Sequence, residues 1–197
     1  MPWITGNRYL SMTEMQNNAD IMYAFFTAHG WTVNAIAAMF GNMQTESTLN
    51  PGIWEDLDPF VGGYGLVQWT PYTNYSDWAG DGWQDNGQKE MERIIYELEH
   101  HLQWISTSRY PMTFQEFITS EKTPAYLAQA FLYNYERPDV TPQPARSRQA
   151  EYWYEYLTGH PPAKQIPIWM LFKIKERRCQ NEQMLHSHAV QKPADGL

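Results

Sequence analysis

One acidic residue, Glu46, stands out in the stretch GNMQTESTLNPG because it falls in the last turn of a predicted helix, just before the stop signal Asn50-Pro51-Gly52. A carboxylate there meets the negative end of the helix dipole, and apolar neighbours on its stripe would exclude water, so both effects disfavour the ionised form. A carboxylic acid that keeps its proton near neutral pH can protonate the leaving oxygen of a glycosidic bond. The competing interpretation is a glutamate that reaches solvent or pairs with a buried donor.

Helices must position this residue, since apolar residues recur at helical spacing along most of the chain. Six or so helices are predicted: two that begin near residues 11–13 and 32, and four that cover 89–105, 113–120, 124–136 and 145–157. Residues 74–88 are expected to form an exposed loop. Gly62-Gly63 is a turn signal and YGLVQW has strand composition, which predicts a small β-hairpin with Tyr64, Leu66 and Gln68 on one face. The predicted fold class is therefore α+β and predominantly α-helical.

The composition limits the domain count and the partners. The chain has 197 residues, enough for one main domain with its own core, and its net charge of -8 argues against a nucleic-acid partner. Nowhere do about 18 apolar residues run together, so no membrane span is expected. No Gly-rich phosphate loop, HExxH motif or paired CxxC occurs, and we therefore expect neither a cofactor nor a metal site.

The last part of the chain differs from the rest in charge. Residues 1–162 hold eight Lys and Arg against 19 Asp and Glu, whereas residues 163–197 hold six against three. We expect a main domain over residues 1–160 and a basic C-terminal tail or linker over residues 161–197. The tail includes IPIWMLFKIKERR, which fits a membrane-surface or partner-binding helix as well as a segment docked on the main domain.

Three short motifs occur in a fixed order: Glu46-Ser47, then Gly65-Leu66-Val67-Gln68, then the string YNYERP that begins at Tyr133. This order resembles the three motifs shared by goose-type lysozymes and soluble lytic transglycosylases, with Val67 where those proteins have Met. The strings NMQTESTLNPGIW, GYGLVQWTP, YNYERP and QAEYWYEYL resemble the phage tail lysozyme family more closely. Together they span most of residues 9–159.

The resemblance implies a lysozyme-like fold with a small β-hairpin beside the cleft. It implies a muramidase that cuts the β-1,4 bond between N-acetylmuramic acid and N-acetylglucosamine in the glycan strands of peptidoglycan. The protein would be carried on a phage tail and used to breach the host cell wall, with other phage tail proteins as further candidate partners. Glu46 takes the position of the general acid. The residues implied to bind or orient substrate are Gln68, Tyr135, Ser47, Trp69 and Tyr64.

The second catalytic carboxylate is less clearly marked. Asp58 and Asp56 are the candidates, although Asp beside Pro or near Gly is also common in turns for local reasons. A partner about 5 Å from Glu46 would suit a retaining nucleophile, and one roughly 6.5 to 9.5 Å away an inverting base. The related transglycosylases need no second carboxylate, because a hydroxyl of the sugar itself attacks. Two alternatives therefore stay open: a lytic transglycosylase, and a wall-binding structural component of a virion with little turnover.

Overall fold

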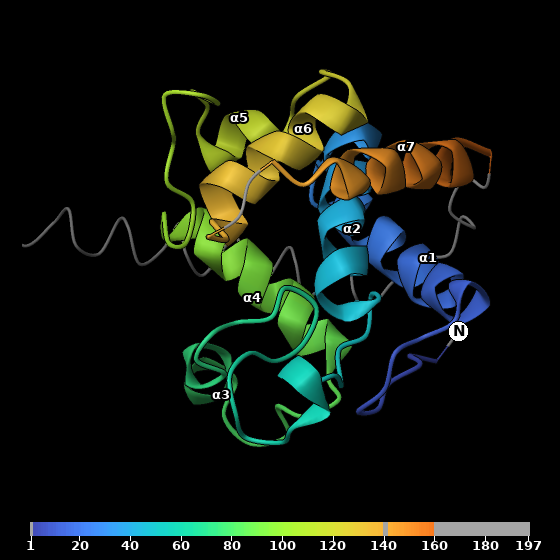
Figure 1. Ribbon diagram of the computed structural model, residues 1–197, viewed down its shortest axis with the longest axis vertical. Helices are drawn as coiled ribbons and strands as arrows, with labels where there is room; N and C mark the ends of the chain where they lie inside the picture. The colour runs from blue at the N-terminus through green and yellow to red at the C-terminus, as the bar shows by residue number, and fades with distance from the viewer. Residues whose placement is uncertain (1, 140–141, 160–197) are drawn as a thin grey trace, which may run out of the picture. The chain divides into compact units, whose positions relative to one another are not determined.

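The computed structural model describes residues 2–139 and 142–159, and this part of the chain is built mainly of helices (Figure 1). The elements in chain order are α1 (Met12–Ala28), α2 (Val33–Ser47), the 3-10 turn η1 (Glu55–Leu57), α3 (Thr73–Ala79), α4 (Gly87–Glu99), α5 (Phe114–Ile118), α6 (Pro124–Phe131), the π-helical turn η2 (Leu132–Glu136) and α7 (Pro144–Gly159). This confirms the prediction of a predominantly helical fold, which is consistent with the lysozyme-like class.

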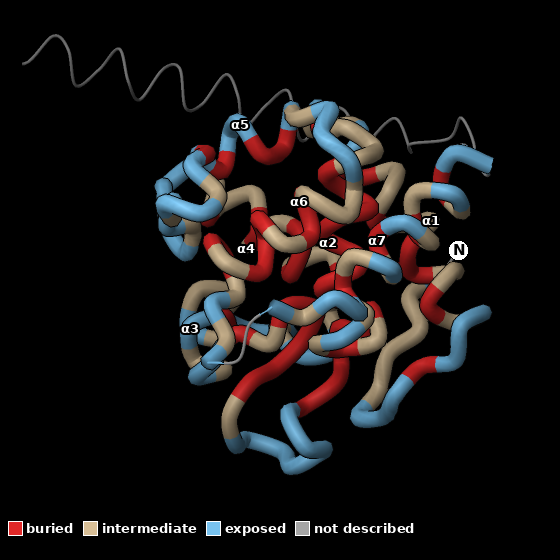
Figure 2. Tube along the Cα trace, turned by 45° about the horizontal axis from the view of Figure 1, so that its top comes forward, coloured by how far each residue is buried: buried red, intermediate tan, exposed pale blue. Residues whose placement is uncertain are grey.

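Helix α2 forms the centre of the core (Figure 2). The Thr32 side chain caps it by accepting a hydrogen bond from the Ala35 amide at 3.2 Å. Every residue from Ala35 to Met43 is buried. Most of them are alanine, glycine or methionine, whose small or flexible side chains let α6 and α7 approach closely. At Gly41 the approach is closest, because a Cβ atom added there would lie 2.5 Å from the Arg146 carbonyl oxygen of α7.

The predicted β-hairpin is wrong for this structure, which has no strand in its described residues. Residues 53–69 form tight turns joined by two isolated antiparallel bridges, Trp54 with Tyr64 and Tyr64 with Trp69. The physical reason is the backbone of the GLVQ motif. Gly65 has φ +78° and Gln68 has φ +51°, both in the left-handed region, and the Gln68 amide donates to the Gly65 carbonyl at 3.1 Å. An extended strand cannot contain such a turn, so the predicted alternation of faces fails.

The helix predictions hold with shifted ends. The predicted helix 89–105 is α4, which ends at Glu99 because His101 and Gln103 adopt positive φ. The helix predicted for 124–136 divides into α6 and the π-helical turn η2, so the YNYERP motif begins in a wider turn with a different side-chain spacing. The loop expected at 74–88 contains the short helix α3, which was not predicted.

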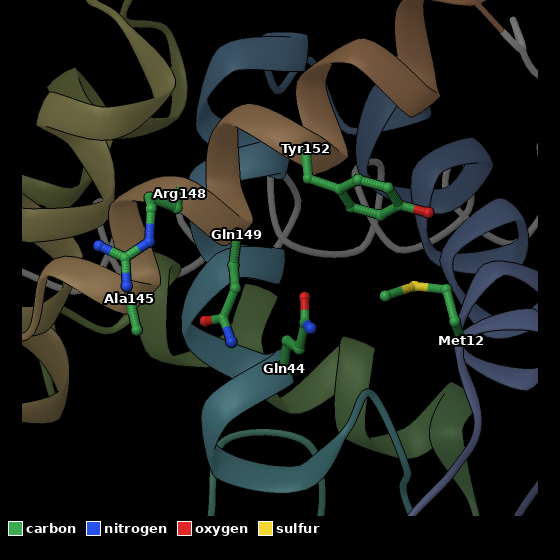
Figure 3. Close-up of a pocket in the computed structure, with 6 residues that line it drawn as sticks. All are labelled: Met12, Gln44, Ala145, Arg148, Gln149 and Tyr152. Carbon is green, nitrogen blue, oxygen red and sulfur yellow. The ribbon is translucent and has the colours of Figure 1, made fainter.

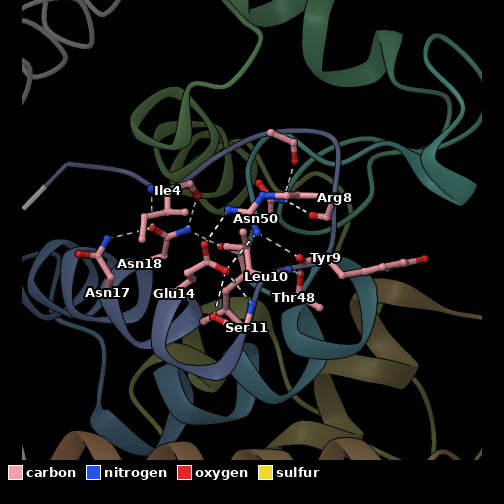
Figure 4. A network of polar contacts seen from close by, with 12 residues as sticks. Ile4, Arg8, Tyr9, Leu10, Ser11, Glu14, Asn17, Asn18, Thr48 and Asn50 are labelled. Atoms are coloured by element: carbon pink, nitrogen blue, oxygen red, sulfur yellow. Dashed lines mark hydrogen bonds and ion pairs between the residues drawn. The ribbon is translucent and has the colours of Figure 1, made fainter.

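The N-terminal segment is fixed to the core by two buried asparagines (Figure 4). The Asn18 side chain accepts from the Ile4 amide at 2.9 Å and donates to the carbonyls of Ile4 at 2.7 Å and Leu49 at 2.9 Å. Asn50 donates to the carbonyls of Gly6 at 2.7 Å and Arg8 at 2.6 Å. These contacts hold the chain just after α2, where the helix must stop for Glu46 to lie at its end.

The predicted basic tail, residues 161–197, lies outside the described residues, so the boundary near residue 160 stays a prediction. None of the helices in the part of the chain that the structure describes is both long and apolar enough to cross a bilayer.

Candidate active site

Glu46 lies in the last turn of α2, as predicted, and it faces α7. Its Oε1 lies 2.5 Å from Nη2 of Arg146, and the side chains are 21% and 4% exposed, respectively. The Arg146 guanidinium is thus a buried donor to Glu46, as in the competing interpretation of this glutamate, and the contact is a charge-assisted hydrogen bond. The site is therefore an ion pair whose acidic member keeps some access to solvent and whose basic member is buried.

Arg146 is held in place by two groups besides Glu46, one on α2 and one just before α7. Its Nη1 donates to Oδ1 of Asn42 at 3.1 Å, and its Nε donates to Oε1 of Gln143 at 2.6 Å. Asn42 is itself fixed, since its amide donates to the carbonyls of Ala38 and Ala128, both at 3.0 Å. The guanidinium has little freedom to leave Glu46.

A second carboxyl group near Glu46 comes from Glu136, which the sequence analysis did not single out. Glu136 ends the π-helical turn η2, and its Oε1 is buried with no hydrogen-bond partner among the described residues. Burial, followed by the negative charge of Glu46, raises the pKa of the Glu136 carboxyl well above its ordinary value, while Arg146 acts in the opposite direction. The structure thus brings together one carboxyl with a cation and one without a hydrogen-bond partner for its buried oxygen.

Glu97 of α4 is the third carboxyl in this region, and its side chain is fully paired. Its Oε1 accepts from Nε1 of Trp69 at 2.8 Å and from Nε of Arg93 at 2.9 Å, while its Oε2 accepts from the Tyr135 hydroxyl at 2.5 Å. Burial and the charge of Glu97 raise the pKa of the Tyr135 phenol well above its ordinary value. Tyr135 and Trp69 therefore direct their polar atoms at Glu97, inside the protein.

The other residues predicted to bind substrate join α2 to the turn at 64–69. Oγ of Ser47 lies 2.8 Å from the Leu66 carbonyl oxygen, Nε2 of Gln68 donates to the Gly65 carbonyl at 3.0 Å, and the Tyr64 hydroxyl accepts from the Asp85 amide at 2.8 Å. Ser47 and Tyr64 are buried, and Gln68 is half-buried. In the structure these side chains hold the turn at 64–69 and join it to α2 and to Asp85. Their contact with substrate stays a prediction.

The 64–69 turn also rests on Glu90, a buried acid that was not anticipated. Its Oε2 accepts from the Leu66 amide at 2.7 Å, and its Oε1 is buried without a partner in the described part of the chain. Burial raises the pKa of the Glu90 carboxyl well above its ordinary value. A Cβ on Gly65 would lie 2.5 Å from this carboxyl group, which explains why the motif has glycine there. Glu90 therefore supports the turn through a carboxyl group whose burial disfavours the charged form.

Asp56 and Asp58, the predicted second carboxylates, lie in and just after η1 and are exposed to solvent. The tryptophans of this region differ in burial. Trp54 and Trp69 are buried at 5% exposure, with Trp54 against Phe60 and Tyr64, whereas Trp78 and Trp83 are half-buried. For Trp54 and Trp69, packing is the main role.

An open pocket of about 250 Å³ lies between the start of α1, the end of α2 and α7 (Figure 3). Its lining residues are Met12, Gln44, Ala145, Arg148, Gln149 and Tyr152. Neither Glu46 nor Glu136 lines it, so it is separate from the carboxyl site. No group of three or more acidic, histidine or cysteine residues in the described ranges is arranged to hold a metal ion.

A helical domain with carboxyl groups gathered at the end of its central helix is consistent with the lysozyme-like class of proteins. A sequence profile of the phage tail lysozyme family matches residues 17–157, and the chain belongs to this family. It is also 48% identical over 157 residues to "Morphogenesis protein 1" of Bacillus phage B103. That match covers 78% of this chain and 42% of the relative, so the chain spans less than half of the relative's length.

Proposed function

We propose that this chain is a muramidase that hydrolyses the β-1,4 bond between N-acetylmuramic acid and N-acetylglucosamine, with Glu46 as the general acid. The observation that supports this role best is the position of Glu46: it ends the central helix and is 21% exposed, whereas Glu97 and Glu90 of the same region are buried. It is thus placed to combine access to a sugar with a partly desolvated environment. Membership in the phage tail lysozyme family supports peptidoglycan as the substrate.

In the proposed reaction the Glu46 carboxyl gives its proton to the leaving oxygen as the glycosidic C1–O bond breaks. Water then adds its hydroxyl to C1, and its remaining proton returns to the carboxylate. Arg146 lies beside Glu46 throughout and offsets the negative charge that forms when the proton leaves. Gln68, Tyr135, Ser47, Trp69 and Tyr64 are the candidates for binding or orienting substrate. Asp56 and Asp58 stay candidates for the second catalytic carboxylate.

The decisive test compares Glu46→Gln with the parent chain on purified peptidoglycan, measured as release of reducing ends. Gln keeps the shape of the side chain but cannot donate the proton, and we expect the rate to fall by about 10²–10⁴-fold. Glu121→Gln, which changes an exposed acid at the surface, is the matched control and should keep the parent rate. Parent activity in Glu46→Gln would refute the assigned role.

A second candidate function is a virion structural component that binds the cell wall with little turnover. The observation that favours it is the name of the B103 relative, which describes morphogenesis. Wall binding by the parent chain with neither new reducing ends nor anhydro-muramic ends would select this candidate. Mass spectrometry of the products separates the third possibility, because a lytic transglycosylase leaves anhydro-muramic ends and a hydrolase leaves reducing ends. Detection of the protein in purified virions would test the proposed tail location.

A further inference from the structure

The pocket between the start of α1, the end of α2 and α7 contains four side chains that can donate hydrogen bonds (Figure 3). These donors are Gln44, Arg148, Gln149 and Tyr152, and the other two lining residues, Met12 and Ala145, are apolar. Figure 3 shows the amide groups of Gln44 and Gln149 close together, with the Tyr152 ring on one side and the Arg148 guanidinium on the other. The lining of this pocket of about 250 Å³ therefore offers donors and a cation, and none of the six lining residues is acidic.

The two amide groups are oriented by hydrogen bonds to their oxygen atoms. Oε1 of Gln44 accepts from Nε1 of Trp153 at 2.9 Å, and Oε1 of Gln149 accepts from the Thr45 hydroxyl at 2.8 Å. Because a protein donor engages each oxygen, the NH₂ group of each amide is directed away from that donor. Neither Nε2 atom has a partner among the described residues, and an amide nitrogen can only donate. The pocket thus has two fixed donors that are available to a ligand.

Tyr152 and Arg148 complete the set of donors. The Tyr152 hydroxyl accepts from Nε2 of Gln16 at 2.8 Å, which leaves its own hydrogen to be donated. Arg148 forms no ion pair with any residue that the structure describes, and its planar guanidinium matches the geometry of a carboxylate. Ala145 lies in the first turn of α7, where the helix dipole favours a negative group. All these features suit one ligand chemistry, an anionic group that only accepts hydrogen bonds.

We propose that this pocket binds a carboxylate of the peptide branch of peptidoglycan, while the sugar that carries the branch lies at Glu46. The position of the pocket supports this ligand. Thr45, which bonds Gln149, is next to Glu46 in the chain, and Gln149 follows Arg146 by three residues, about 4.5 Å along α7. The peptide branch is attached to the muramic sugar, beside the bond to be cut. The inference rests on the proposed function in this choice of polymer.

Binding of a small probe tests the pocket without turnover. Muramyl dipeptide has a single sugar and one free carboxylate, and its amide derivative has the same sugar and no carboxylate. By titration calorimetry we expect the parent chain to bind the dipeptide at least about tenfold more tightly than the amide, because hydrogen bonds to a charged group are the stronger ones. In spectra of the ¹⁵N-labelled chain, the side-chain NH₂ signals of Gln44 and Gln149 should shift with the dipeptide. Equal affinity for the two probes, or binding of neither, would overturn the proposal.

Two variants place the probe in this pocket. Gln149→Glu keeps the side-chain shape and the acceptor for Thr45 but replaces a donor with a negative charge, and Arg148→Gln removes the cation. Each should weaken binding of muramyl dipeptide by about tenfold or more. Gln115→Glu makes the same change at an exposed position of α5 and should keep the parent affinity. Parent affinity in both pocket variants would overturn the proposal. Displacement of the dipeptide by an equal concentration of inorganic phosphate would also overturn it, because the pocket would then bind anions in general.

The hydrolysis assay separates this inference from the proposed function. The measured quantity is the ratio of kcat/KM for intact peptidoglycan to kcat/KM for glycan strands from which an amidase has removed the peptides. This ratio should exceed one in the parent and in Gln115→Glu, and it should fall towards one in Gln149→Glu. An unchanged ratio in Gln149→Glu would refute the peptide pocket even if the chain is a muramidase. Conversely, full activity of Glu46→Gln would refute the function and leave the binding of muramyl dipeptide to judge the pocket.

Discussion

Gly41→Ala tests whether the close contact between α2 and α7 governs the stability of this domain. Gly41 sits mid-helix, where alanine would ordinarily stabilise by about 0.5–1 kcal/mol. In this structure, however, the added Cβ would lie 2.5 Å from the Arg146 carbonyl oxygen, 2.7 Å from the Ala150 amide nitrogen and 2.9 Å from the Ala150 Cβ. Two of these three atoms belong to backbone, which cannot rotate away as a flexible side chain could.

The size of the effect follows from the distance that must be gained. Ordinary contact begins near 3.4 Å, so α7 must move by about 1 Å or α2 must distort. Overpacking of this kind costs about 1–3 kcal/mol, from which the gain in helix propensity is subtracted. We expect a net loss of about 1–2 kcal/mol, or a Tm lower by roughly 2–8 °C for a domain of this size. Because α7 carries Arg146, hydrolytic activity should fall as well.

Thermal unfolding followed by circular dichroism measures the change in Tm, and Gly159→Ala is the matched control. Gly159 ends α7 and has no atom within 4 Å of an added Cβ, so alanine there should change stability by less than about 0.5 kcal/mol. Equal Tm values for the two variants would show that the α2–α7 contact yields without cost. The reasoning from the Cβ distances would then be wrong.

Two further predictions concern buried polar groups. The pKa of the Glu90 carboxyl is raised in the folded state, whereas in the unfolded chain it is near 4.5, so the folded state binds this proton more tightly. The resulting contribution to stability is complete below about pH 4.5 and declines as the pH rises from there towards the folded-state pKa. Glu90→Gln keeps an acceptor for the Leu66 amide and cannot ionise. The free energy of unfolding of this variant, measured by urea titration, should therefore decline less than that of the parent between pH 5 and pH 8. Parallel curves of unfolding free energy against pH would contradict this. Asn18→Ala removes three hydrogen bonds to the backbone of Ile4 and Leu49 and should cost about 1–3 kcal/mol, with faster hydrogen exchange at the Ile4 amide; an unchanged exchange rate would show that the N-terminal segment is held by other contacts.

The sequence was sufficient to predict the longer helices and the place of Glu46, because both depend on local signals, whereas the short helix α3 was missed. Apolar spacing marks the buried face of a helix, and Asn50-Pro51-Gly52 ends α2 whatever surrounds it. The hairpin failed because strand composition and a Gly-Gly pair say nothing of left-handed φ at Gly65 and Gln68. That conformation is fixed by distant groups, among them the Glu90 carboxyl against Gly65.

The partners of Glu46 could not be predicted from their own neighbourhoods. Arg146 lies 100 residues from Glu46, and only the fold brings them together. A signal was nevertheless present: Arg146 shares the spacing of Ala150, Trp153 and Leu157, and a cation on an apolar stripe must find a buried partner. Glu90 and Glu97 carry the same signal, since both lie on the buried stripe of α4. Acidic residues at apolar positions therefore identify this site better than the exposed Asp56 and Asp58 do.

The first two motifs are in direct contact, whereas the second and third are connected through a residue outside them, and this determines which changes should affect the site. Ser47 of the first motif reaches the second directly, at the Leu66 carbonyl. The second and third motifs do not need to touch, because Glu97 of α4 accepts from both Trp69 and Tyr135. Helix α4 thus supplies the buried acids for both regions, Glu90 under the turn and Glu97 between the motifs. A substitution in α4 can consequently displace the turn at 64–69 or Tyr135 without altering any motif residue. Conservative changes within the motifs can be tolerated where these buried contacts remain.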